Sequence, residues 1–270
     1  MDWVAALPMY NVTPSLARDW RALLAHVRRH MHPWLDARGD ALHIVEPEPS
    51  LTEFWLRNDL LLSQTCGYPL VHALAGRVQL VSTPAFHVDG CERGEYRSVL
   101  VANRRAGVTS LAACRGLRAA FNNADSNSGM NLLRAAVAPL AEGRDFFASV
   151  IETGGHLASL SALQDDHADV AAIDAVTFAF VRDHLPDLAQ GVVQLGVTRS
   201  APGLPLIASK RVPQDVVNAL AASLDACVAD DPALAKRLKL TGFIQRPLDD
   251  YAAILEIETD AAKLGYPRLA

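Results

Sequence analysis

The feature that most limits how this chain can fold is a repeated alternation of short apolar stretches with stretches of helical periodicity. ASVIET at residues 148–153 and DVAAID at residues 169–174 have strand length, and each is followed by a segment that reads as a helix. This order predicts an α/β fold with mixed sheets flanked by helices, because each strand can return through a helix that covers the sheet. The 270 residues, half of them apolar, suffice for two lobes of roughly 100–150 residues each.

The same pattern assigns most of the chain to strands or helices. We expect strands near residues 4–10, 41–49, 59–65, 78–86, 96–103, 117–123, 148–153, 169–174 and 192–198. We expect helices near residues 16–30, 51–55, 108–116, 128–140, 154–163, 175–185, 213–228, 231–238 and 251–264.

Charge and hydropathy exclude several classes of partner. The net charge of −5 and the absence of a basic stripe argue against a nucleic-acid partner. No apolar run approaches the ~20 residues that span a bilayer, so no stable membrane insertion is expected. The start, MDWVAALPMYNV, lacks a basic region followed by an apolar one, and we expect no signal peptide in this chain.

Motifs for metals, cofactors and common enzyme chemistry are missing from the sequence. Cys66, Cys91, Cys114 and Cys227 show no zinc-type spacing, and a Cys66–Cys91 pair is left open. His26 and His30 have helical spacing but no evident acidic partner, so no metal site is expected. GxxxxGK[ST], GxGxxG, HExxH and GxSxG are absent. We therefore expect no catalytic residue and no cofactor.

The most unusual stretch is NNADSNSGMNLLRAAVAPL at residues 122–140, where a polar cluster precedes an apolar-striped helix that should begin near Ser128–Gly129. The first turn of a helix leaves backbone N–H groups without partners and carries partial positive charge. A single serine or aspartate there is usually only a cap, but paired serines and a glycine suit a bound oxyanion. The candidate ligand-binding residues are Ser126, Asn127, Ser128 and Gly129.

Two later strand–helix pairs place polar residues at equivalent positions. His156 lies at the start of the helix after the strand at 148–153, where it could donate to an anion or simply cap the helix. Asp174 ends the apolar run VAAI, and its alternative role is an N-cap. Open α/β sheets bind ligands at the carboxyl ends of their strands, so three adjacent units of this kind would converge on one pocket.

With these residues in place, the chain resembles the substrate-binding components of phosphate/phosphite/phosphonate ABC transporters. The resemblance rests on ALPMY, DLLLSQTCGYP, YRSVLVAN, NNADSNSG, ETGGHLAS and ADVAAIDAVTF. It implies a two-lobe type II periplasmic-binding-protein fold, with oxyanion contacts from Ser126 to Gly129, His156 and Asp174. It also implies contacts from loops of the other lobe, here Tyr10, Ser63, Gln64 and Thr65. Known phosphonate binders carry an aromatic residue in the second of these loops, whereas here Tyr68 is slightly displaced.

The resemblance further implies an organisation and a function. Lobe I would comprise residues 1–99 and 199–270 and lobe II residues 100–198, with the strands at 96–103 and 192–198 as the hinge. A small anionic ligand, a phosphonate, phosphite or phosphate, would bind in a cleft between the lobes for uptake through an ABC transporter permease from the periplasm. The alternative is a cytosolic anion-binding sensor or enzyme on the same fold. Thiamine-pyrimidine synthases share the architecture, but the four scattered cysteines do not reproduce their cysteine cluster.

Asp174 bears on which anion is bound. A carboxylate repels a fully ionised ligand and favours one that offers a proton or an ammonium group. We therefore expect discrimination against sulfate, which is fully deprotonated at neutral pH.

Overall fold

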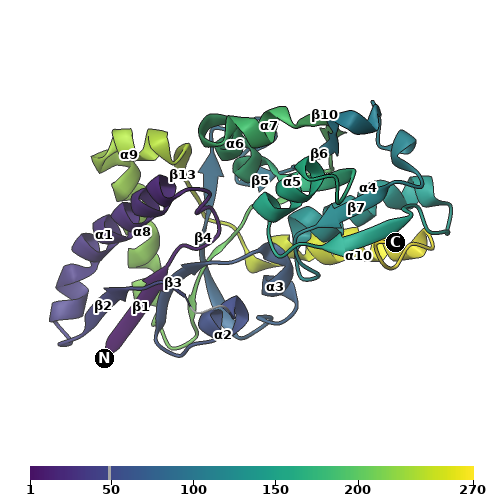
Figure 1. Ribbon diagram of the computed structural model, residues 1–270. Helices are drawn as coiled ribbons and strands as arrows, with labels where there is room; N and C mark the ends of the chain where they lie inside the picture. Colours follow the sequence, from purple (N-terminus) through teal and green to yellow (C-terminus); the bar gives the residue numbers. More distant parts are fainter. Residues whose placement is uncertain (48–49) are drawn as a thin grey trace. The chain divides into compact units, whose positions relative to one another are not determined.

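The computed structural model describes residues 1–47 and 50–270, which form two compact units (Figure 1). The first unit contains residues 1–87, 92–94 and 203–250, and the second contains residues 88–91, 95–202 and 251–270. Each unit has its own mixed sheet and helices, as an α/β fold requires.

The first unit is built on a six-stranded sheet of order β13-β4-β12-β3-β1-β2. β1, β2 and β3 are mutually parallel, whereas β12 runs antiparallel to β3 and β4, and β13 runs antiparallel to β4. The strands are β1 (Asp2–Ala6), β2 (Ala41–Ile44), β3 (Leu60–Gln64), β4 (Val78–Phe86), β12 (Leu206–Ser209) and β13 (Leu240–Ile244). The helices are α1 (Pro14–Asp36), α2 (Leu51–Trp55), α3 (Gly67–Val71), α8 (Gln214–Asp230) and α9 (Pro232–Arg237). The 3-10 turn η4 (Leu248–Tyr251) begins in this unit and ends at the first residue of the second unit's last segment.

Helix α1 (Pro14–Asp36) forms where the sequence predicts a helix but is longer than expected. Thr13 is the N-cap, and its side chain accepts a hydrogen bond from the N–H of Leu16. Its buried stripe runs from Leu16 through Val27 to Met31 and Leu35, so packing extends the helix to Asp36, past the end expected near residue 30. On that face α1 packs against α8 and α9 (Figure 1). The end of the strand expected at 41–49 includes residues 48 and 49, which lie outside the described residues.

The second unit is built on a five-stranded sheet of order β10-β6-β9-β7-β8. β7, β8 and β9 are parallel, and β6 and β10 are antiparallel to their neighbours. The strands are β6 (Ser98–Asn103), β7 (Arg118–Phe121), β8 (Ser149–Glu152), β9 (Val170–Asp174) and β10 (Val192–Val197), with a separate pair β5 (Glu95–Tyr96) and β11 (Ala201–Pro202). The helices are α4 (Leu132–Ala141), α5 (His156–Gln164), α6 (Ala175–His184), α7 (Pro186–Gln190) and α10 (Ala252–Lys263), with 3-10 turns η1 (Arg104–Ala106) and η2 (Ala112–Cys114) and the π-helical turn η3 (Asn127–Asn131).

The helix expected at 108–116 is the clearest error among the expected elements. Only the 3-10 turn η2 forms there, with Ser110 Oγ accepting from the N–H of Ala113. Gly107 and Gly116 both adopt positive φ angles, of 67° and 77°, and these left-handed residues end the segment on both sides.

Residues 251–270, the C-terminal segment, belong to the second unit, whereas the expected division placed residues 199–270 in lobe I. Ala261 and Tyr266 join the core of the second unit beside Leu133 and Phe146. Helix α10 packs against α4 (Figure 1), which explains why this segment groups with the second unit. The strands β6 and β10, expected to form the hinge, pair with each other inside the sheet of the second unit.

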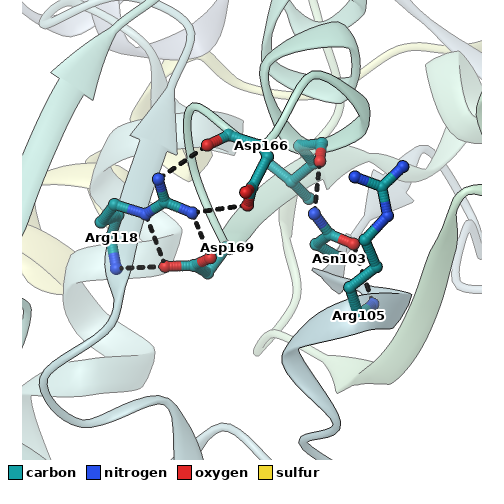
Figure 2. Close-up of polar contacts among 6 residues, drawn as sticks. Asn103, Arg105, Arg118, Asp166 and Asp169 are labelled. Atoms are coloured by element: carbon teal, nitrogen blue, oxygen red, sulfur yellow. Dashed lines mark hydrogen bonds and ion pairs between the residues drawn. The ribbon is translucent and has the colours of Figure 1, made fainter.

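An ion-pair network fastens the amino ends of β7 and β9. Figure 2 shows the Arg118 guanidinium held between Asp166 and Asp169. Hydrogen bonds from Arg118 lower the pKa of Asp169, and the same contacts raise the pKa of Arg118. This clamp lies at the end of the sheet opposite the carboxyl ends of these strands, and Asp166 contributes both its side chain and its carbonyl to it.

All four cysteines lie in the described part of the chain, and none of them forms a disulfide. In residues 1–47 and 50–270, none of the helices combines the length and the apolarity that crossing a bilayer requires.

Candidate functional site

Three helices of the second unit begin at the same end of its sheet, where the parallel strands have their carboxyl ends. β7, β8 and β9 are parallel, with Phe121 opposite Glu152 and Ala120 opposite Ala171. Their carboxyl ends therefore lie together, and each leads into a helix: η3 and α4 after β7, α5 after β8, and α6 after β9. This is the edge at which open α/β sheets bind ligands.

The helix start after β7 is a π-helical turn with Ser126 as its N-cap. The side chain of Ser126 accepts from the N–H of Gly129 at 3.1 Å, and its carbonyl accepts from the N–H of Asn131 at 3.0 Å. This wider turn begins at Asn127, slightly before the expected start. Such π turns are frequent at functional sites. The N–H of Ser128 has no hydrogen-bond partner in the described part of the chain, which leaves a donor for a ligand.

Ser128 and His156 bring the first two helix starts into contact. Ser128 Oγ lies 2.8 Å from His156 Nε2 and 3.3 Å from Ser126 Oγ. Burial lowers the pKa of His156 to about 4, so its imidazole is neutral at pH 7. His156 Nδ1 is buried and has no hydrogen-bond partner among the described residues. An unpaired buried ring nitrogen is costly, and a bound ligand would satisfy it.

Asp174 is buried and caps α6. Its Oδ1 accepts from the N–H groups of Val176 and Thr177, at 2.8 and 3.0 Å, which matches the capping alternative. Ser98 lies opposite Asp174 in the β6–β9 pair, and Ser98 Oγ donates to the carbonyl of Ser128 at 3.0 Å. Ser98 therefore links Asp174, its partner across the β6–β9 pair, to the turn that contains Ser128.

The environment of Asp174 also affects a cysteine. Burial, and then the negative charge of Asp174, raise the pKa of Cys91 to about 12. Cys91 is therefore a protonated thiol at neutral pH, which gives it little nucleophilic character.

Gly129 has a packing role where the sequence suggested close approach of a ligand. A Cβ atom at this position would overlap Oδ1 of Asn122 and lie 2.8 Å from its Cγ. The absent side chain thus makes room for Asn122. Asn122 Oδ1 is itself buried without a hydrogen-bond partner among the described residues.

Sequence reasoning missed several polar residues at this edge. Ser98 stands at the start of the strand SVLVAN, before four apolar residues, and Asn122 lay inside the polar cluster without being singled out. Tyr96 OH accepts from Asn127 Nδ2 at 2.9 Å. Only the strand pairing reveals that residues 96–98 lie beside the Ser128 turn.

The four candidates in the first unit are buried at the carboxyl end of β3 and after β1. Tyr10 packs on the rings of Trp20 and Phe86, at centroid distances of 6.2 and 5.4 Å. Gln64 Nε2 donates to the carbonyl of Leu204, and Thr65 Oγ1 donates to that of Cys66. Their role in ligand binding stays a prediction.

Ser63 differs from its neighbours in the first unit. Its hydroxyl is buried and has no hydrogen-bond partner among the described residues, and the same is true of Ser82 on β4. Ser82 pairs with Leu206 of β12, which also pairs with Gln64, so the two serines lie on strands that flank β12. Tyr68 stacks on His72 within the α3 region, with ring centroids 4.2 Å apart.

No metal site accompanies these residues. Within the described ranges, no cluster of three or more His, Cys, Asp or Glu side chains is arranged to hold a metal ion.

The chain has the type II periplasmic-binding-protein fold, shared with solved structures that cover nearly all of it. PhnD1 from Prochlorococcus marinus in complex with methylphosphonate matches with a TM-score of 0.73 and 15% identity, over 97% of this chain and 98% of that one. A binding-protein component of an ABC phosphonate transporter from Pseudomonas aeruginosa gives 0.71 and 15%, over 97% and 87%. XAC2383 from Xanthomonas citri bound to ATP gives 0.68 and 17%, over 97% and 98%. No curated protein has a matching sequence.

Residues 57–251 match the family described as "ABC transporter, phosphonate, periplasmic substrate-binding protein". This match spans more than half of the chain, and the chain belongs to that family. Members of the family are periplasmic binding proteins of transporters rather than enzymes.

Proposed function

We propose that this protein captures a small phosphorus oxyanion, a phosphonate, phosphite or phosphate, at the helix starts of the second unit. The observation that carries the proposal is the convergence of unpaired donors there. The N–H of Ser128 and the buried Nδ1 of His156 lack partners among the described residues, and the Ser128 hydroxyl joins the two helix starts. A phosphoryl group supplies oxygens that satisfy such donors.

The charge of the site fits an anion held by neutral groups. Removing water from a small anion is unfavourable unless fixed donors replace it, and each hydrogen bond to a charged group contributes about 1.5–3 kcal/mol. Because burial keeps His156 neutral, the imidazole acts as an oriented donor and adds no counter-charge.

The proposal keeps Asp174 as the source of selectivity. Its carboxylate is buried, and Ser98 links it to the Ser128 turn. A bound anion that carries no proton would be repelled by this negative charge. A ligand that retains a proton avoids this repulsion, and sulfate does not.

Transport and location complete the proposal. Membership of the family supports delivery of the ligand to an ABC permease in the periplasm, with no bond made or broken. Tyr10, Ser63, Gln64 and Thr65 remain predicted contributors of further ligand contacts.

A thermal-shift and calorimetric panel tests the function. It contains phosphate, phosphite, methylphosphonate, 2-aminoethylphosphonate, sulfate and ATP, the last because a structural relative was solved with it. At 100 times Kd a ligand stabilises the folded state by about 2.7 kcal/mol, which corresponds to a rise in Tm of about 5–10 °C. Stabilisation by a phosphorus oxyanion but not by sulfate is the expected result. A response to none of the phosphorus compounds would overturn the proposal.

A further inference from the structure

A buried arginine lies behind the Ser128 turn. Arg134, on the first turn of α4, is 4% exposed. Its Nη1 donates to the carbonyl of Pro267 at 2.9 Å, and its Nη2 donates to Oδ1 of Asn131 at 2.6 Å. Nη2 also lies 3.5 Å from Oε1 of Glu258. Arginine is rarely buried unless it is paired, so this side chain calls for a reason.

From Arg134 a chain of side-chain hydrogen bonds leads to the proposed oxyanion site. Asn131 Nδ2 donates to Asn127 Oδ1 at 2.9 Å, and Asn127 Nδ2 donates to Tyr96 OH at 2.9 Å. Asn131 Nδ2 also donates to the carbonyl of Ile254 in α10, at 3.2 Å. This series of hydrogen bonds therefore joins α4, α10 and the π turn within the second unit.

Arg134 favours one orientation of the two asparagine amides. A guanidinium can only donate, so Asn131 must turn its oxygen toward Arg134 and its amide nitrogen toward Asn127. Asn127 must then present its own oxygen to Asn131 and its nitrogen to Tyr96. The Ile254 carbonyl can only accept, so it favours the same orientation of Asn131 as Arg134 does.

The two asparagines are the first and last residues of the π turn, Asn127–Asn131. Their side-chain hydrogen bond spans the turn, in addition to the backbone bond from Asn131 N to Ser126 O. Ser128 lies between them and is held from another side by Ser98. The orientation of the Ser128 donors thus depends on both asparagines.

We propose that Arg134 is a positioning residue for oxyanion binding. Anchored by Glu258 and Pro267 of the C-terminal segment, it fixes Asn131 and Asn127 and so holds the Ser128 turn in its binding geometry. The inference rests on the proposed function of that turn. A purely structural role for Arg134 is the competing explanation, and the two differ in what they predict for affinity.

The first test compares two arginines of the second unit. Arg134→Met and Arg118→Met are prepared in the full chain, and Kd for phosphate, phosphite and methylphosphonate is measured by calorimetry beside stability in urea. Arg118 clamps the opposite edge of the sheet and serves as the matched control. We expect both variants to lose stability, but only Arg134→Met to raise Kd, by about tenfold or more. Equal Kd in the Arg134 variant and the wild type would overturn the proposal.

A second variant covers the case in which Arg134→Met fails to fold. Asn131→Asp keeps an oxygen for Arg134 and adds a charge that pairs with it, but removes the donor to Asn127 and Ile254. We expect it to fold, with a Kd raised by about tenfold. Wild-type affinity in Asn131→Asp would also overturn the proposal.

The outcomes separate this inference from the function on which it rests. A wild-type protein that binds no phosphorus oxyanion refutes both. Tight binding by the wild type and by both variants refutes only the positioning role of Arg134.

Discussion

Ser128 Oγ and His156 Nε2 lie 2.8 Å apart, and this contact joins the helix start after β7 to the helix start after β8. Neither residue acts as the helix cap of its own turn, since Ser126 caps η3 and Gly155 precedes α5 without a side-chain bond. No backbone group depends on either side chain. With the Ser128 hydroxyl donating to Nε2, neutral His156 carries its proton on Nδ1, which is left to donate to a ligand.

Ser128→Ala should weaken binding with little effect on folding. The variant removes the hydroxyl that donates to His156 Nε2 and so keeps the ring proton on Nδ1, facing the ligand. A hydrogen bond from such a donor to a charged group contributes about 1.5–3 kcal/mol, so its loss should raise Kd about tenfold or more. Ser126→Ala is the comparison for stability, because loss of its cap on Gly129 should lower the free energy of unfolding by about 1 kcal/mol. Calorimetry and urea unfolding measure the two effects. Unchanged affinity in Ser128→Ala would contradict the assignment.

His156 should make the ligand-free protein less stable as the pH falls from about 6.5 toward 4. Its pKa in the folded protein, about 4, is below the ordinary value of 6.5, so the unfolded chain binds more protons in this interval. The stability due to neutral His156 is complete above pH 6.5 and decreases as acid is added. His156→Gln should show a shallower slope of Tm against pH over the same interval. An NMR titration that placed the His156 pKa near 6.5 would refute this prediction.

Asp174→Asn should relax selectivity without unfolding the protein. Asparagine caps helices about as well as aspartate, so the bonds to Val176 and Thr177 can persist and stability should change by less than about 1 kcal/mol. The loss of negative charge should let sulfate compete with the phosphorus ligand. A competition assay at constant ionic strength measures this, and unaltered discrimination would count against a role for Asp174 in selectivity.

Gly129→Ala should destabilise the second unit through Asn122. The new methyl group would overlap Asn122 Oδ1, and overpacking of this kind costs about 1–3 kcal/mol. Asn122→Ala removes an unpartnered oxygen, so the double variant Asn122→Ala/Gly129→Ala should recover much of the loss. Urea unfolding of the two single variants and the double variant forms the required cycle. Additive losses would show that the two residues do not interact.

Local pattern was enough to predict much of the fold and part of the site. β4 occupies residues 78–86 as expected, because this mostly apolar and β-branched stretch is bounded by Arg77 and His87. The polar clusters at Ser126–Gly129, His156 and Asp174 were visible because each interrupts an apolar pattern at a strand end. Their presence at one sheet edge follows from three parallel strands.

What the sequence did not reveal depends on contacts between distant residues. His30 lies 3.0 Å from Asp230, and His26 lies 3.6 Å from Asp231, although neither histidine has an evident acidic partner nearby in the chain. The network from Arg134 to Pro267 likewise spans segments far apart in sequence. Spacing within one helix or strand carries no information about such pairs.

The division of the chain has a consequence for its synthesis on the ribosome. Residues 203–250 belong to the first unit and separate α10 from the rest of the second. A nascent chain that has emerged only through residue 202 therefore lacks the helix that covers α4 and the residues Ala261 and Tyr266 of its core. Until those last residues leave the exit tunnel, apolar surface on α4 stays open to water and to other chains, so chaperone contacts during translation should concentrate there.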